Sequence, residues 1–187
     1  MKKLLFVLWF MPLTLLAQEN ENLFFKWSTF GSAGLTVGQS GGKPIFQLSS
    51  GINYNRFFTG IGVGYDNYEF NTIPVFADWR WRFGKKESGF IYAIGGYNFP
   101  AKNKDIFEWA KISDKLNGGI YFDFGIGGGL AVSKSNRILF SAGFTRKAIR
   151  QQKIFVYPCF NNCDEELYRL KYSFGRLTAK LSWELGY

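Results

Sequence analysis

Hydrophobic residues recur at every second position along most of the chain after residue 25. In the last stretch, apolar residues occupy the odd positions from Leu177 to Tyr187, and polar or small residues occupy the even positions from Arg176 to Gly186. Successive side chains of a β-strand point to opposite faces of the sheet. This period therefore predicts strands with one apolar face and one polar or small face. Eight segments fit the pattern: 26–37, 45–55, 57–67, 73–83, 89–99, 118–132, 137–149 and 167–187.

Two of these segments depart from simple alternation. The fifth is apolar on both faces, because all five residues at 90–94 are hydrophobic. The eighth changes parity near Phe174 and Gly175. We expect a bulge or a bend there, since one extra residue in a strand shifts the pattern to the other face.

The connections predict an up-and-down sheet, in which alternate connections lie at opposite ends. Short connections rich in Asn, Gly, Lys and Ser predict tight turns at 55–57, 84–88 and 133–136. The longer connections are 38–44, 67–72, 100–117 and 150–166. We therefore expect all the tight turns at one end and the long loops at the other. Residues 104–112 could form a short helix within the third long loop.

The two faces differ in side-chain volume, and this predicts which of them is inside. An eight-stranded barrel has an interior just wide enough for side chains to fill. The apolar faces carry bulky aromatics, including Trp79, Trp81 and Trp183. The opposite faces carry runs of glycine at 60, 62, 64, 125, 127 and 129. This favours a transmembrane barrel with its apolar face on lipid. A soluble, lipocalin-like exported barrel with the reverse orientation is the alternative.

The beginning of the chain has the pattern of a secretory signal peptide. Lys2 and Lys3 precede an apolar run over residues 4–17, and the chain then becomes polar. A helix that spans a membrane needs about 20 residues, so we predict cleavage after Ala17 and a single barrel domain over 18–187. In an exported chain, Cys159 and Cys163 are expected to form a disulfide, with two free thiols as the alternative.

Composition then limits the chemistry. The chain has no His among its 187 residues, which excludes Ser-His-Asp triads and His-ligated metals. No cofactor is predicted. The strand pattern instead turns charged residues inward, and because buried charges need partners we predict a charge-paired plug in the lumen. Its members are Asp78, Arg80, Arg82, Asp123, Arg176, Lys180 and Glu184. A gated pore or a hidden catalytic group is the alternative.

The chain is basic, with a formal net charge of +9. A cluster at the start of the last long loop predicts contacts with lipopolysaccharide phosphates, which Lys and Arg bind well. It consists of Arg146, Lys147, Arg150 and Lys153. An ordinary solvated rim is the alternative, and nucleic acid is not an expected partner of an exported barrel.

The signal peptide, the eight strands and the terminal segment 181–187, which ends on an aromatic residue, resemble small Gram-negative outer-membrane β-barrels of the OmpA and OmpX size class. Residues 73–80 also look like the fourth strand of such barrels. The resemblance implies an all-β, eight-stranded antiparallel transmembrane barrel, located in the outer membrane as a monomer. It also implies that the assembly machinery reads the last strand, here Trp183, Leu185 and Tyr187.

Lipid A deacylases and palmitoyl transferases resemble this chain in build, but they use a His that it lacks. We therefore expect no enzymatic activity. The expected role is structural or a surface interaction through loops 100–117 and 150–166, with an unknown extracellular partner. A narrow pore for small solutes is the alternative, and a lipid-modifying enzyme is less favoured.

Overall fold

The computed structural model describes residues 25–101, 113–133, 135–156 and 165–186. Within these ranges the chain forms nine strands and one short 3-10 helix, η1 (Lys85–Glu87). The strands are β1 (Phe25–Gly38), β2 (Gly41–Tyr54), β3 (Phe57–Asp66), β4 (Thr72–Phe83), β5 (Gly89–Pro100), β6 (Ser113–Asn117), β7 (Gly119–Ala131), β8 (Asn136–Val156) and β9 (Glu165–Leu185). No helix in these ranges is long and apolar enough to cross a membrane.

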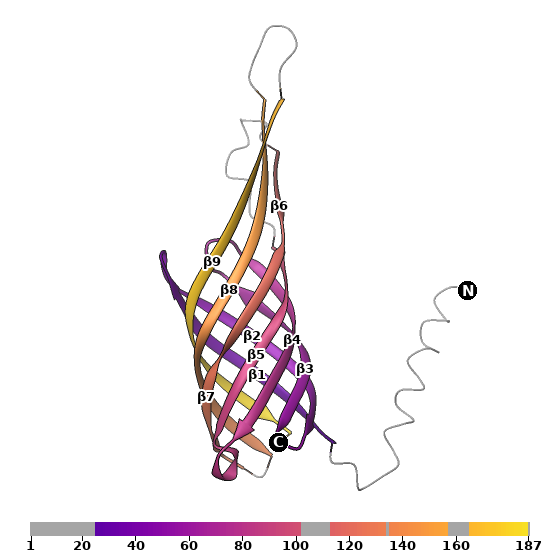
Figure 1. Ribbon diagram of the computed structural model, residues 1–187, viewed down its shortest axis with the longest axis vertical. Coiled ribbons are helices and arrows are strands. Elements are labelled where there is room, and N and C mark those ends of the chain that lie inside the picture. Colours follow the sequence, from indigo (N-terminus) through magenta and orange to yellow (C-terminus); the bar gives the residue numbers. More distant parts are fainter. Residues whose placement is uncertain (1–24, 102–112, 134, 157–164, 187) are drawn as a thin grey trace, which may run out of the picture.

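Eight of the strands close into an antiparallel barrel (Figure 1). Each long strand pairs with its neighbour in sequence, and β1 pairs with β9 from Thr29 opposite Leu185 to Val37 opposite Leu177. Only β6 lies outside this circle, because it pairs with β8 beyond the end of β7. The predicted all-β, eight-stranded up-and-down barrel is confirmed.

The two ends of the barrel differ in their connections. Phe25 and Leu185 lie at one end, the terminal end, together with the short connections 55–56, 84–88 and 132–135. The opposite, loop end carries the longer connections, but also a tight turn. Gln39 and Ser40 alone join β1 to β2, with Gly38 paired to Gly41. The prediction of a long 38–44 loop, and of tight turns at one end only, is therefore wrong.

The glycine-rich sequence around this turn explains the error. Gly41, which follows the two turn residues, has a φ of 86°, a left-handed conformation that glycine adopts without strain. Residues 41–44 contain two glycines and a proline, so they look like loop in the sequence, yet they pair with β1.

Strands β8 and β9 continue beyond the barrel. Their ladder runs without interruption from Asn136 opposite Leu185 to Val156 opposite Glu165. Past the last β7 pair, β6 takes the place of β7 beside β8. We call β6, residues 148–156 of β8 and residues 165–173 of β9 the projecting sheet; it rises from the loop end in Figure 1. The strand predicted to end at 149 extends to Val156, and the strand predicted to begin at 167 begins at Glu165.

Of the bulge or bend expected near Phe174 and Gly175, the bulge is absent. Phe174 pairs with Lys147, Gly175 with Arg146, and Arg176 with Thr145, so no residue is inserted. The backbone keeps its parity, and the apolar residues change from the outer to the inner face of the strand. The change in pattern therefore marks a change in surroundings, because the strand leaves the barrel at this point.

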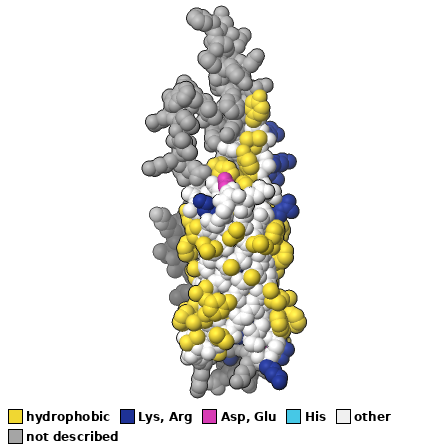
Figure 2. All heavy atoms as spheres, turned by 90° about the vertical axis from the view of Figure 1, so that its left-hand side faces the viewer, with side chains coloured by type: hydrophobic (Ala, Val, Ile, Leu, Met, Phe, Trp, Pro, Cys, Tyr) yellow, Lys and Arg dark blue, Asp and Glu magenta, His cyan; other side chains and the backbone are white. Residues whose placement is uncertain are grey.

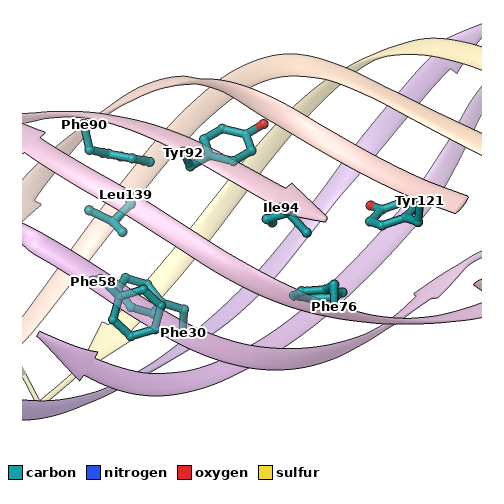
Figure 3. Close-up of a cluster of buried hydrophobic side chains, with 8 residues drawn as sticks. All are labelled: Phe30, Phe58, Phe76, Phe90, Tyr92, Ile94, Tyr121 and Leu139. Carbon is teal, nitrogen blue, oxygen red and sulfur yellow. The ribbon is translucent and has the colours of Figure 1, made fainter. Parts of the chain in front are cut away.

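The orientation predicted from side-chain volume is confirmed. Trp79 is 50% exposed and Phe124 is 56% exposed on the outside of the barrel. The inward positions hold a buried cluster, shown in Figure 3, of Phe30, Phe58, Phe76, Phe90, Tyr92, Ile94, Tyr121 and Leu139. Strand β5 supplies three members of this cluster, which explains why its sequence is apolar on both faces.

The glycine runs make room for these rings. A Cβ atom built on Gly62 would lie 2.4 Å from the ring of Phe76, and one on Gly127 would lie 2.5 Å from the ring of Phe90. Both distances are shorter than van der Waals contact. Glycine at inward positions thus lets aromatic side chains from neighbouring strands fill the lumen.

Several sequence predictions fall outside the described residues. They are the signal peptide at 1–17, the helix at 104–112, the Cys159–Cys163 disulfide and the terminal Tyr187. These remain predictions.

Candidate functional site

The charged side chains that are buried within the described part of the chain lie in the lumen. The buried acids are Asp66, Asp78, Asp123 and Glu184, and the buried cations are Arg80, Arg82, Arg137, Lys147, Arg176 and Lys180. Each acid contacts at least one cation within 4.0 Å. The six cations exceed the four acids by two positive charges.

One ion pair lies within a single strand. Asp78 and Arg80 are two positions apart on β4, so both point inward, and Arg80 Nη2 lies 2.7 Å from Asp78 Oδ2. Ser49 Oγ donates a second hydrogen bond of 2.7 Å to the same carboxylate oxygen. The guanidinium carbon of Arg80 lies 3.8 Å from the centre of the Phe30 ring. This acid is therefore engaged by both a cation and a hydroxyl.

A second network joins four strands across the lumen. Lys180 Nζ lies 2.6 Å from Asp123 Oδ2 and donates to Gln47 Oε1 at 3.1 Å. Tyr92 donates to Asp123 Oδ1 at 3.0 Å, and Gln47 Nε2 donates to the hydroxyl of Tyr121 at 2.9 Å. The participating strands are β2, β5, β7 and β9. These hydrogen bonds offset the cost of burying the charges, because a buried ion pair is tolerated when its remaining hydrogen bonds are satisfied.

Two further contacts lie toward the terminal end. Arg82 of β4 forms an ion pair with Glu184 of β9. The buried Arg137 of β8 donates to the backbone carbonyl of Glu87 in η1. Arg137 thus links the 84–88 connection to β8, and Arg82 links β4 to β9.

The loop end is closed by a group that the sequence analysis only partly identified. Arg176 donates two hydrogen bonds to Asp66, at 2.8 and 2.7 Å. Lys147 Nζ lies 3.3 Å from Asp66 Oδ1 and donates to the backbone carbonyls of Tyr68 and Phe70 at 2.8 and 2.7 Å. The ring of Tyr68 lies 4.9 Å from the guanidinium carbon of Arg176. The β3–β4 connection is thereby held over this end of the lumen.

Asp66 was missed because it stands at the end of its strand. It shares parity with the inward glycines at 60, 62 and 64, and that signal could have placed it in the lumen. Arg137 was missed for the same reason, since it opens its strand on the face that continues inward.

The residues predicted to contact lipopolysaccharide do not form one group. Arg146 and Arg150 are exposed on the outside of β8. Lys147 points into the lumen with 0% of its side chain exposed, so its assignment to a lipid contact is wrong. Alternate residues of a strand face opposite sides, and neighbours in sequence therefore cannot share one surface. The side chain of Lys153 lies outside the described part of the structure.

The projecting sheet has two distinct faces. The face that continues the lumen wall carries Ile149, Leu170 and Tyr172, with Tyr168 next along the strand. The ring of Tyr172 stacks on Phe174, which also contacts Phe70 of the β3–β4 connection. The opposite face carries arginine and lysine. Figure 2 shows hydrophobic side chains over the barrel wall, and Lys and Arg side chains toward its ends and beside the projecting sheet.

No group of three or more His, Cys, Asp or Glu residues within the described ranges could hold a metal ion. On the outside, Trp183 and Leu185 of the predicted assembly signal are exposed, at 46% and 50%.

Comparison with known proteins identifies the fold. No family model matches the sequence, and no curated protein matches it. The crystal structure of the outer membrane protein OprG from Pseudomonas aeruginosa superposes with a TM-score of 0.52 at 8% identity, covering 87% of this chain and 96% of that chain. The N-terminal β-barrel domain of Pseudomonas aeruginosa OprF gives a TM-score of 0.48 at 12% identity, over 87% of this chain and 97% of that chain. Neisserial surface protein A gives 0.43 at 12% identity, with the same coverage. The chain therefore has the closed, eight-stranded antiparallel fold seen in a small outer-membrane β-barrel protein.

Proposed function

We propose that the protein is an integral outer-membrane barrel of a Gram-negative bacterium, exported with a cleaved signal peptide, that acts as a monomer at the cell surface. The outer wall supports this proposal. Each of the eight barrel strands exposes large apolar side chains, among them Trp27, Phe46 and Leu181. Soluble monomers rarely expose apolar patches of more than a few hundred Å², whereas an apolar outer band is the lipid-facing surface of a transmembrane barrel.

The observation that carries the proposed role is the filling of the lumen. Aromatic rings, the network around Asp123 and the group around Asp66 together occupy it. Solute passage would require several buried ion pairs to separate, which is unfavourable in a medium of low dielectric constant. A structural or surface-interaction role is therefore favoured over the alternative, a narrow pore for small solutes.

Planar-bilayer recording tests this choice. Purified protein, shown to be inserted by its heat-modifiable migration in detergent gels, is expected to give no steady conductance steps. Reproducible steps from protein prepared in the same way would support the pore and contradict the closed lumen.

The projecting sheet is the proposed surface for interaction. Residues 165–176 of β9 have β8 on one side and no other strand of the described chain on the other. Backbone groups on such an edge can pair with an extended segment of another protein. The apolar face that carries Leu170 and Tyr172 lies beside this edge. An extracellular partner could thus be bound through both backbone and side chains.

A shortened variant tests that role. Residues 150–171 can be replaced by Asn-Gly, a pair that favours the two-residue turn, because Ile149 and Tyr172 pair directly. Cells producing this variant are expected to keep the barrel in the outer membrane and to lose adherence to protein-coated plates. Unchanged adherence, with equal amounts of barrel, would contradict a role for the projecting sheet.

We propose no enzymatic activity. The buried acids are bonded to cations, and Asp123 and Asp78 also accept hydrogen bonds from neutral groups. This arrangement is typical of carboxylates that stabilise a fold rather than of catalytic ones. Identical lipid A mass spectra with and without the protein are expected, and a changed acyl pattern would favour the lipid-modifying enzyme.

The assembly machinery of the outer membrane is the second proposed partner. Trp183 and Leu185 end the outward face of β9, and Tyr187 continues their alternation in the sequence. Deletion of Tyr187 is expected to lower the amount of protein in the outer membrane. An unchanged amount would contradict this role for the terminal residue.

A further inference from the structure

Four cations gather on the outer face of the β8–β9 ladder, where the barrel ends. Arg146 and Arg150 come from β8, and Arg169 and Lys171 come from β9. All four are exposed. The register places Arg150 directly opposite Lys171, Arg169 opposite Gln152, and Arg146 opposite Gly175.

This cluster begins where the apolar outer face of the β8–β9 ladder stops. One step toward the terminal end, the next outward pair of the ladder is Phe144 opposite Leu177, and both are exposed hydrophobic side chains. On the neighbouring strand, Phe122 is paired with Arg146. The cations therefore lie beside the level at which a lipid bilayer changes from hydrocarbon to headgroups, provided that the barrel spans the membrane.

The cluster contains repulsion that the described protein does not relieve. Like charges directly opposite each other on a ladder are destabilising. All six ion pairs among the described side chains involve other cations, namely Arg80, Arg82, Lys147, Arg176 and Lys180. Arg146 is instead oriented by a neutral group, since its Nε donates to Ser173 Oγ at 2.9 Å. An anion from outside the described chain would reduce the repulsion.

We propose that Arg146, Arg150, Arg169 and Lys171 form a phosphate clamp for the phosphorylated glycolipid of the outer leaflet, lipopolysaccharide. Arginine binds phosphate through two parallel hydrogen bonds, and lysine acts as a point charge. Along a strand, Arg146 and Arg150 are four residues apart, which separates them by roughly 13 Å. The clamp can therefore contact more than one phosphate group. It rests on the proposed outer-membrane location.

The proposal changes the residues assigned to this contact. The sequence cluster included Lys147, which is bonded to Asp66 inside the lumen. The ladder replaces it with Arg169 and Lys171, which lie far away in sequence but on the same face. An acidic partner protein would be attracted by the same charges, but the position beside the apolar wall favours a membrane lipid.

Binding of defined lipopolysaccharide to the full chain in nanodiscs tests the clamp. The variant Arg150→Gln/Lys171→Gln is expected to bind at least ten-fold more weakly than the wild type. The control Lys26→Gln/Arg56→Gln removes the same charge from exposed residues at the terminal end, and it is expected to bind like the wild type. Enzymatically dephosphorylated lipopolysaccharide should bind wild type and variant equally weakly.

The outcomes separate this proposal from the one on which it rests. Equal binding by the clamp variant and the wild type, in protein with normal heat-modifiable migration, would overturn the clamp. Complete displacement by millimolar inorganic phosphate would also overturn it, because the site would then be a general anion site. Membrane fractionation of the wild type is done in parallel. Absence from the outer membrane would instead contradict the proposed function.

Discussion

Strands β8 and β9 each pass through two regions of the molecule, and their side-chain pattern inverts between them. In the barrel, Leu181 and Phe140 face outward and Lys180 faces inward. In the projecting sheet, Tyr172 lies on the inner face and Lys171 on the outer face. The backbone register continues unbroken through the change. The polarity of a face thus reports what surrounds it, and the inversion locates the end of the apolar wall.

Removal of a charge should affect the free energy of unfolding far more in the lumen of the barrel than in the projecting sheet. Asp123→Ala leaves Lys180 buried without its carboxylate, and it is expected to lower the free energy of unfolding by about 3–5 kcal/mol. Arg150→Ala, in the projecting sheet, should change it by less than about 0.5 kcal/mol. Urea unfolding in lipid vesicles, followed by tryptophan fluorescence, measures both.

The double variant Asp123→Leu/Lys180→Met serves as the control for charge burial. It removes both charges and is expected to recover most of the loss, because an apolar pair can replace a buried ion pair. A single variant as stable as the wild type would contradict a desolvated lumen.

A cation added to the outer face should give the next largest difference in the free energy of unfolding between the barrel wall and the projecting sheet. Leu181→Arg places a cation on the apolar wall and is expected to cost about 2–4 kcal/mol near the bilayer midplane. Gln152→Arg lies on the outer face of the projecting sheet, beside Arg169, and should cost about 0.5 kcal/mol or less. Equal costs in the same vesicles would mean that the two outer faces have the same surroundings.

Replacement of glycine by alanine should cost more stability at an inward position of the barrel wall than at an outward one. A Cβ on inward Gly62 would lie 2.4 Å from the Phe76 ring, whereas nothing lies within 4 Å of a Cβ on outward Gly31. Gly62→Ala is expected to cost about 1–3 kcal/mol through overpacking, and Gly31→Ala close to nothing. Phe76→Leu should partly rescue the first variant. Failure of Gly62→Ala to destabilise the barrel would contradict a tightly filled lumen.

The smallest effect on the barrel is expected from the cysteines. Cys159→Ser/Cys163→Ser removes the predicted disulfide, whose small ring contributes about 2 kcal/mol or less. The heat resistance of the barrel should stay unchanged, and cleavage between residues 157 and 164 by added protease should become faster. Rapid labelling of both cysteines by a maleimide, without reduction, would show that the disulfide is absent.

The strands, and which of their side chains point inward or outward, could be predicted from the sequence because both depend on local alternation. A barrel residue such as Trp79 or Gly62 has only two environments available, and its volume distinguishes them. The partners across the lumen could not be predicted. Arg82 reaches Glu184 and Lys180 reaches Asp123 because of the stagger between strands far apart in sequence. The parity change near Phe174 was detected, but its cause became clear only from the unbroken ladder.

Quenching of single tryptophans by brominated lipids tests the central claim most directly. One variant keeps Trp79 and has its other tryptophans replaced by Phe; the second has all of them replaced and carries Gln152→Trp. Trp79, on the barrel wall, is expected to be strongly quenched, and the tryptophan at position 152, on the outer face of the projecting sheet, to be quenched little or not at all. Equal quenching of the two, or an unquenched Trp79, would contradict a barrel that spans the membrane with the projecting sheet outside it.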